Sequence, residues 1–168
     1  ACLELQKAPS GNRMREVLVE SLPDRAGLQK RLNRIFRQQI HPRIWKCKRD
    51  FNVAIDLTLI PYHGQPYEDK KEIVRSAPKS GTTHFHGYAT VSIVRDNRRY
   101  VVALRFIEYG EEMAEIVRWL LKRLKALHFC IRRMFLDKGF CAKPVFKVLE
   151  QHKVSFVIPI PVRGKAGG

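Results

Sequence analysis

Residues 51–62 read FNVAIDLTLIPY, and this stretch decides the fold. Alternate residues form one apolar face: Val53, Ile55, Leu57 and Leu59. Asp56 belongs to the other face, among small and apolar neighbours. An alternation with a period of two residues is typical of a strand, and a proline ends it. The pattern therefore predicts a strand over Asn52–Ile60 that carries a carboxylate into a mostly apolar layer.

A second aspartate, Asp137, follows another apolar run, in IRRMFLDKGF at residues 131–140. Burying a carboxylate costs on the order of several kcal/mol unless a nearby positive charge compensates the negative charge. A metal ion shared by Asp56 and Asp137 would supply that charge. The alternative is a pair of structural acids that cap turns or bind arginines, and composition and spacing alone favour this alternative.

Length and charge restrict the class of protein. The chain has 168 residues, 45% of them hydrophobic, which suits one domain with its own core. Lys and Arg number 32 against 16 Asp and Glu, giving a formal charge of +16. Such an excess predicts a polyanionic partner, with nucleic acid as the default. No apolar run approaches the roughly 20 residues of a membrane-spanning helix, so we expect an intracellular protein without a membrane partner.

Residues 1–50 are expected to form a basic helical lead-in. Short helices are predicted over Arg13–Ser21 and Arg25–Ile40, separated by Pro23 and Asp24. Their faces rich in Arg and Lys suit contact with DNA, but they equally suit an ordinary solvated helix, and charge alone does not decide between the two.

Residues 51–168 predict an α/β core with a mixed sheet. After the first strand, a polar loop is expected at residues 62–83. The later elements are predicted as strands His84–Val94 and Tyr100–Ile107, helix Glu111–His128, strand Ile131–Leu136, helix Ala142–His152 and strand Val154–Ile160. The order β-β-β-α-β-α-β is the ribonuclease H-like arrangement, a mixed sheet flanked by helices.

In that arrangement the first and fourth strands are neighbours, so Asp56 and Asp137 would meet at one edge of the sheet. Hard cations such as Mg²⁺ prefer oxygen ligands, and paired ions clamp the attacking and leaving oxygens of a phosphodiester displacement. The two carboxylates are expected to approach within about 4–6 Å, the distance at which they could share a cation.

Three stretches also carry a family resemblance: AIDLTLIPYHG, THFHGYATVSI and RRMFLDKGFCAKPVFKVLEQHKVSFVIPIP. Together they resemble the catalytic core of insertion-sequence transposases of the DDE class, in particular the IS-four-like branch. The resemblance runs from about Asn52 to the C-terminus, and the LDKGF stretch with its following helix is the most specific part. It implies DNA transposition, by metal-dependent cleavage and strand transfer at transposon ends. Asp56 and Asp137 would be the catalytic ligands of Mg²⁺ or Mn²⁺.

The family's third acid, a glutamate on a helix after the fifth strand, has no counterpart here. Residues 151–168 contain no Asp or Glu, and Glu150 precedes the fifth strand on the wrong helix. The sequence therefore predicts a truncated or degenerate transposase core that is inactive by itself.

Five basic residues are predicted DNA contacts: Lys70, Lys71, Arg75, Lys79 and Lys138. The first four lie in the polar loop, where Glu68, Asp69 and Glu72 favour a merely solvated loop. Lys138 follows the second aspartate, at a position where the family often has Arg or Lys. His84 and His86 lie on one strand face and could approach DNA or a metal, but a structural role is favoured.

The competing hypothesis is a non-enzymatic, basic nucleic-acid-binding domain, which requires only the positive charge. The transposase hypothesis adds transposon-end and target DNA as partners, a homo-oligomer in the full-length protein, and a cytoplasmic, nucleoid-associated location in a prokaryote. The two hypotheses differ in whether Asp56 and Asp137 share a cation.

Overall fold

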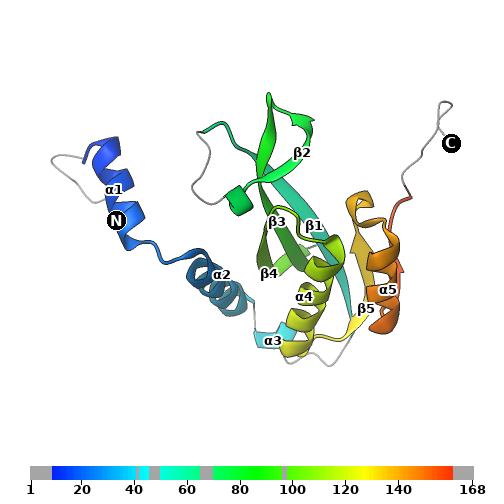
Figure 1. The fold of residues 1–168 in the computed structure, drawn as a ribbon. Coiled ribbons are helices and arrows are strands. Elements are labelled where there is room, and N and C mark those ends of the chain that lie inside the picture. Colours follow the sequence, from blue (N-terminus) through cyan, green and yellow to red (C-terminus); the bar gives the residue numbers. More distant parts are fainter. Residues whose placement is uncertain (1–8, 41, 46–49, 65–69, 96–97, 161–168) are drawn as a thin grey trace.

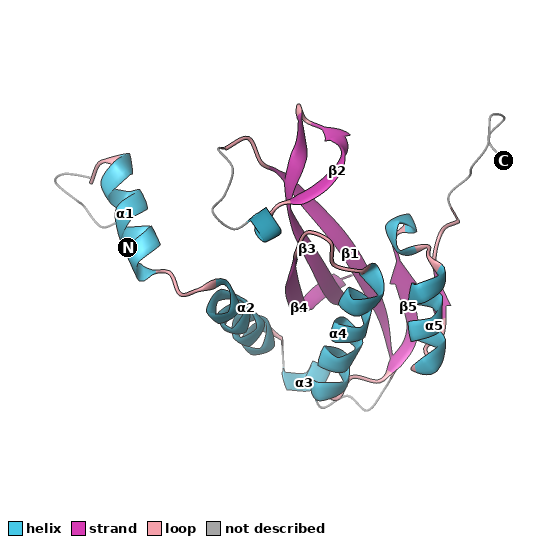
Figure 2. Ribbon diagram, viewed as in Figure 1, coloured by secondary structure: helices cyan, strands magenta, loops and turns pink. Residues whose placement is uncertain are grey.

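A six-stranded mixed sheet forms the centre of the fold (Figures 1 and 2). The computed structural model describes residues 9–40, 42–45, 50–64, 70–95 and 98–160. The strands are β1 (Phe51–Pro61), β2 (Val74–Lys79), β3 (Thr82–Arg95), β4 (Arg98–Ile107), β5 (Ile131–Leu136) and β6 (Phe156–Val157). β1 lies in the middle, antiparallel to β3 and parallel to β5. The strands follow the order β2-β3-β1-β5-β6, with β4 also paired to β3, so the predicted ribonuclease H-like sheet is confirmed.

Two helices cover one face of this sheet. The helical elements are α1 (Gly11–Ser21), α2 (Arg25–Gln39), α3 (Pro42–Trp45), η1 (Lys70–Glu72), α4 (Met113–Ala126), η2 (Lys138–Phe140) and α5 (Lys143–Gln151). The apolar stripes of α4 and α5 pack on the sheet around Val53 and Met134, both fully buried. Crossover helices return the chain in one direction, which explains why β1, β5 and β6 are parallel. None of the described helices is long and apolar enough to span a membrane.

The prediction of a polar loop over residues 62–83 is wrong in part, because this stretch contains η1 and β2. β2 forms a hairpin with β3 through Ser80 and Gly81, whose φ angles are 52° and 76°. Two positive φ angles in a two-residue connection are typical of a tight hairpin turn. The strand lacked an alternating apolar pattern because nearly all of it is exposed. Pro78 is tolerated there because β2 is an edge strand.

The last strand is shorter than predicted, since β6 spans only Phe156 and Val157 instead of Val154–Ile160. Pro159 carries no backbone N–H and therefore cannot extend the ladder with β5. Phe156 stacks on Phe146 of α5, with ring centroids 5.7 Å apart, so the short strand is fixed by a side-chain contact as well.

Helix α2 closes the outer edge of β4. The Asn33 side chain is 6% exposed; its Oδ1 accepts the Leu104 N–H at 3.1 Å and its Nδ2 donates to the Leu104 carbonyl at 3.5 Å. Gln29 accepts the Phe106 N–H at 3.1 Å in the same manner. These amides occupy backbone groups that a further strand would otherwise use. Part of the basic lead-in is therefore attached directly to the sheet.

Replacing Asn33 by alanine should lower the free energy of unfolding by about 1–3 kcal/mol, because the Leu104 N–H and carbonyl lose their partners. The urea midpoint of unfolding, followed by circular dichroism, measures this change. Gln38→Ala is the matched control, since Gln38 is an exposed amide on the same helix. Equal midpoints for the two variants would contradict the role given to Asn33.

Candidate functional site

The register between β1 and β5 brings the two aspartates to one level of the sheet. Ile55 pairs with Leu136 in the parallel ladder, and Asp56 and Asp137 are the next residues of the two segments. Ile55 and Leu136 are 3% and 4% exposed, beneath α4 and α5. Because side chains alternate between faces along a strand, Asp56 belongs to the opposite face, and Asp137 directly follows the end of β5. The predicted neighbourhood of the first and fourth strands of the core is therefore confirmed.

The expectation that both carboxylates are buried is wrong. Asp56 is half-buried and Asp137 is exposed. The physical reason is that α4 and α5 cover only one face; on the other, Phe135 and Val157 remain 38% and 45% exposed. Since neither carboxylate is fully desolvated, no large energetic penalty demands a cation. The placement of the two acids, and not their burial, is therefore the feature that favours a metal site.

Asp137 is held by a short turn with two apolar anchors. Leu136 precedes it and Phe140 follows it, 4% and 0% exposed respectively. Between them Asp137, Lys138 and Gly139 face solvent. The Asp137 Oδ1 accepts the Lys138 N–H at 2.6 Å, and the Asp137 carbonyl accepts the Phe140 N–H at 3.0 Å. The LDKGF sequence therefore encodes a fixed platform that presents one carboxylate and one cation.

Asp56 lies in the interior of β1, opposite Thr90 of β3. Within the part of the chain that the structure describes, no hydrogen bond or ion pair reaches its carboxylate. The alternative hypothesis, that the two acids cap turns or bind arginines, therefore applies to Asp56 and Asp137 differently. Asp137 does cap a turn, whereas Asp56 has neither a turn to cap nor an arginine partner among those residues.

One carboxylate comes from β1 and the other from the residue that follows β5, and carboxylate oxygens are the donor type that Mg²⁺ and Mn²⁺ prefer. They form an incomplete set. Among residues 9–160, apart from the undescribed gaps, no group of three or more His, Cys, Asp or Glu comes together to hold a metal. Glu150 is exposed on the last turn of α5, the helix that covers the opposite face of the sheet.

The predicted DNA contacts fall into two groups. Lys138 is exposed beside Asp137 at the start of η2. Lys70 and Lys71 lie in η1, and Arg75 and Lys79 in β2, all exposed. Lys70 and Arg75 also line a cavity that the sequence did not reveal. Glu68 and Asp69, which counted against DNA contact, lie outside the described residues.

Comparison with protein families decides the classification. The family model described as "Transposase DDE domain" matches residues 52–167, which includes every strand of the sheet but the first residue of β1. The chain belongs to this family. The match begins at the second residue of β1, the strand that carries Asp56, and includes the platform of Asp137, so both predicted ligands lie inside the transposase domain.

Two solved structures are distantly similar to the transposase domain. One is a simian T-cell lymphotropic virus intasome in complex with PP2A regulatory subunit B56 gamma, with 11% identity, a TM-score of 0.39 and coverage of 71% of this chain. The other is a piggyBac transposase synaptic complex with hairpin DNA, with 16% identity, a TM-score of 0.42 and 68% coverage. This chain spans 35% and 23% of the respective chains. No curated protein sequence matches it.

The hydrogen bond from the Lys138 N–H to the Asp137 carboxylate predicts different effects on stability for two substitutions at Asp137. Asp137→Asn keeps an oxygen that accepts the Lys138 N–H, whereas Asp137→Ala removes it. We expect Asp137→Ala to cost about 0.5–1 kcal/mol of stability, and Asp137→Asn to cost less. Chemical denaturation measures both, and equal losses would show that the bond does not stabilise the turn. Asparagine is accordingly the substitution that removes the charge while keeping the platform.

Proposed function

We propose that this transposase domain serves DNA transposition, by metal-dependent strand cleavage and strand transfer at the ends of an insertion sequence, and that it falls in the IS-four-like branch. The supporting observation is the position of Asp56 and Asp137, one residue beyond a paired position on adjacent parallel strands. Two acids at one level of a sheet can ligate the same cation. Two structural acids would have no need of this common position.

Asp56 and Asp137 would hold Mg²⁺ or Mn²⁺. When bound, the metal supplies charge stabilisation to the reacting oxygens of the phosphodiester. The remaining work belongs to the chain itself. The Lys138 N–H orients the Asp137 carboxylate through the 2.6 Å bond, and the exposed Lys138 side chain lies where a DNA phosphate next to the aspartates would approach. Anchoring by Phe140 keeps both groups in place.

DNA is the proposed partner because the formal charge is +16 and because exposed lysines and arginines lie beside Asp137 and in η1 and β2. Lys71, Lys79 and Lys138 would contact transposon-end or target backbone phosphates. A third acid from outside these 168 residues would complete the ligand set, so the domain alone is proposed to be inactive. In the whole protein, assembly as a homo-oligomer in a prokaryotic cytoplasm would bring DNA ends together.

The metal proposal can be tested without catalysis. Mn²⁺ binding to the 168-residue chain, followed by electron paramagnetic resonance, should weaken about tenfold or more in Asp56→Asn and in Asp137→Asn, because each loses one of two charged ligands. Asp50→Asn is the matched control, an exposed aspartate immediately before β1. Its Mn²⁺ affinity should be unchanged.

A double variant separates a shared ion from two independent ones. If one cation bridges the acids, Asp56→Asn combined with Asp137→Asn should weaken binding by less than the product of the two single effects. Mn²⁺ affinities that are equal in all four proteins would refute the metal site. They would leave the competing hypothesis, a non-enzymatic domain that binds DNA by charge alone.

A further inference from the structure

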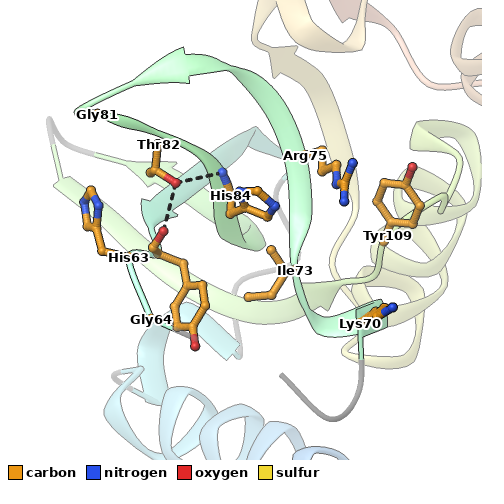
Figure 3. A pocket seen from close by; sticks show the side chains of 10 residues that line it. His63, Gly64, Lys70, Ile73, Arg75, Gly81, Thr82, His84 and Tyr109 are labelled. Carbon is orange, nitrogen blue, oxygen red and sulfur yellow. Dashed lines mark hydrogen bonds between the residues drawn. The ribbon is translucent and has the colours of Figure 1, made fainter. Parts of the chain in front are cut away.

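A cavity of about 660 Å³ lies beyond the end of β1, between that strand, the β2–β3 hairpin and the loop after β4 (Figure 3). The last residue of β1, Pro61, is five residues past Asp56, and neither Asp56 nor Asp137 lines this cavity, so the cavity is separate from the two aspartates. Its volume is within the range of pockets that bind small molecules or single building blocks of polymers. Its principal lining residues are Tyr62, Lys70, Arg75, Thr82, His84 and Tyr109.

The walls of the cavity are tied together by hydrogen bonds. Tyr62 donates its N–H to the His84 carbonyl at 2.8 Å, and its own carbonyl accepts the Thr82 hydroxyl at 2.9 Å. Thr82 Oγ1 also accepts the His84 N–H at 3.1 Å. On the other side, the Tyr109 N–H donates to the Lys71 carbonyl at 2.8 Å, which fixes the loop after β4 against η1. The cavity is therefore a built feature of the fold.

The chemistry of the lining is cationic and aromatic. Lys70 and Arg75 carry positive charges, His63 and His84 offer ring nitrogens, and none of the ten described lining residues is acidic. The Arg75 guanidinium lies over the Tyr109 ring, 6.0 Å from its centroid. In Figure 3, Arg75, Tyr109 and Lys70 lie on one side of the cavity and His63 lies on the other. Tyr109 is 56% exposed, so its ring is accessible to a ligand.

We propose that this cavity binds one nucleotide of an unpaired DNA strand. The base would stack on the accessible ring of Tyr109, since aromatic side chains accept any base by its π face. Arg75 and Lys70 would hold the adjoining phosphate, and the carbonyls and hydroxyl around Thr82 would offer polar contacts. Duplex DNA presents phosphates but conceals the faces of its bases, so the tyrosine has a role only for an unpaired strand. The inference rests on DNA as the partner and is independent of the metal ligands.

The test compares single-stranded and duplex DNA in EDTA, so that the result does not depend on a metal. Fluorescence anisotropy of a short labelled oligothymidylate reports binding to the 168-residue chain. Tyr109→Ala should weaken single-strand binding about fivefold or more and leave duplex binding nearly unchanged. Tyr109→Phe should retain single-strand binding, because the ring remains.

Arg75→Ala should weaken binding and lower the slope of log affinity against log salt by about one. Lys147→Ala is the charge-matched control: Lys147 is exposed on α5, away from the cavity. The proposal is overturned if Tyr109→Ala has no effect, if it affects duplex and single strand equally, or if Lys147→Ala reproduces Arg75→Ala. Thymidine monophosphate that binds as tightly as the oligonucleotide would overturn the assignment to a DNA strand and indicate a free nucleotide instead. A defect in Mn²⁺ binding leaves all these outcomes unaffected.

Discussion

The parallel pairing of β1 with β5 is the constraint on which the rest of the structure depends. The chain enters β5 from β4, which runs in the same direction, so the connection needs a crossover such as α4, because two parallel strands cannot be joined by a tight turn. That requirement places α4 on one face of the sheet and leaves the opposite face to other contacts. The same pairing fixes the level at which each strand ends. A shift of one residue would move Asp56 away from Asp137 and would also turn Val53 out of the core.

Most of the central sheet could be predicted because its strands are buried on at least one face. Burial imposes the alternation seen in β1 and again in β3, and the spacing of Met113, Ile116 and Leu120 identifies α4 in the same way. β2 was missed because an exposed edge strand has no core-facing residues to impose a pattern. The Ser80–Gly81 pair was the available signal, since that dipeptide marks a tight turn.

The candidate site could likewise be predicted only in part. The placement of Asp56 and Asp137 at one level of the sheet followed from topology, which the sequence encodes through the order of its elements. The degree of burial of the two aspartates could not be predicted, because alternation distinguishes the two faces of a strand but does not show which face is covered by helices. The cavity was beyond sequence reasoning altogether. Arg75 lies in β2, Tyr62 directly follows β1 and Tyr109 lies in the loop after β4, so these residues come together only in the folded chain.

The attachment of α2 to β4 has a consequence for how the protein behaves when that helix is released. Asn33 and Gln29 hold the helix by polar bonds along an open strand edge, and Arg25 adds a bond to the Ile107 carbonyl at 3.1 Å. Detachment by a protease or a competing partner would expose unpaired backbone groups, the surface through which sheets of different molecules join. Helix α2 thus covers a strand edge at which the sheet could otherwise pair with another strand. This helix, which the sequence predicts only as part of a basic lead-in, therefore protects the fold against self-assembly through an open strand edge.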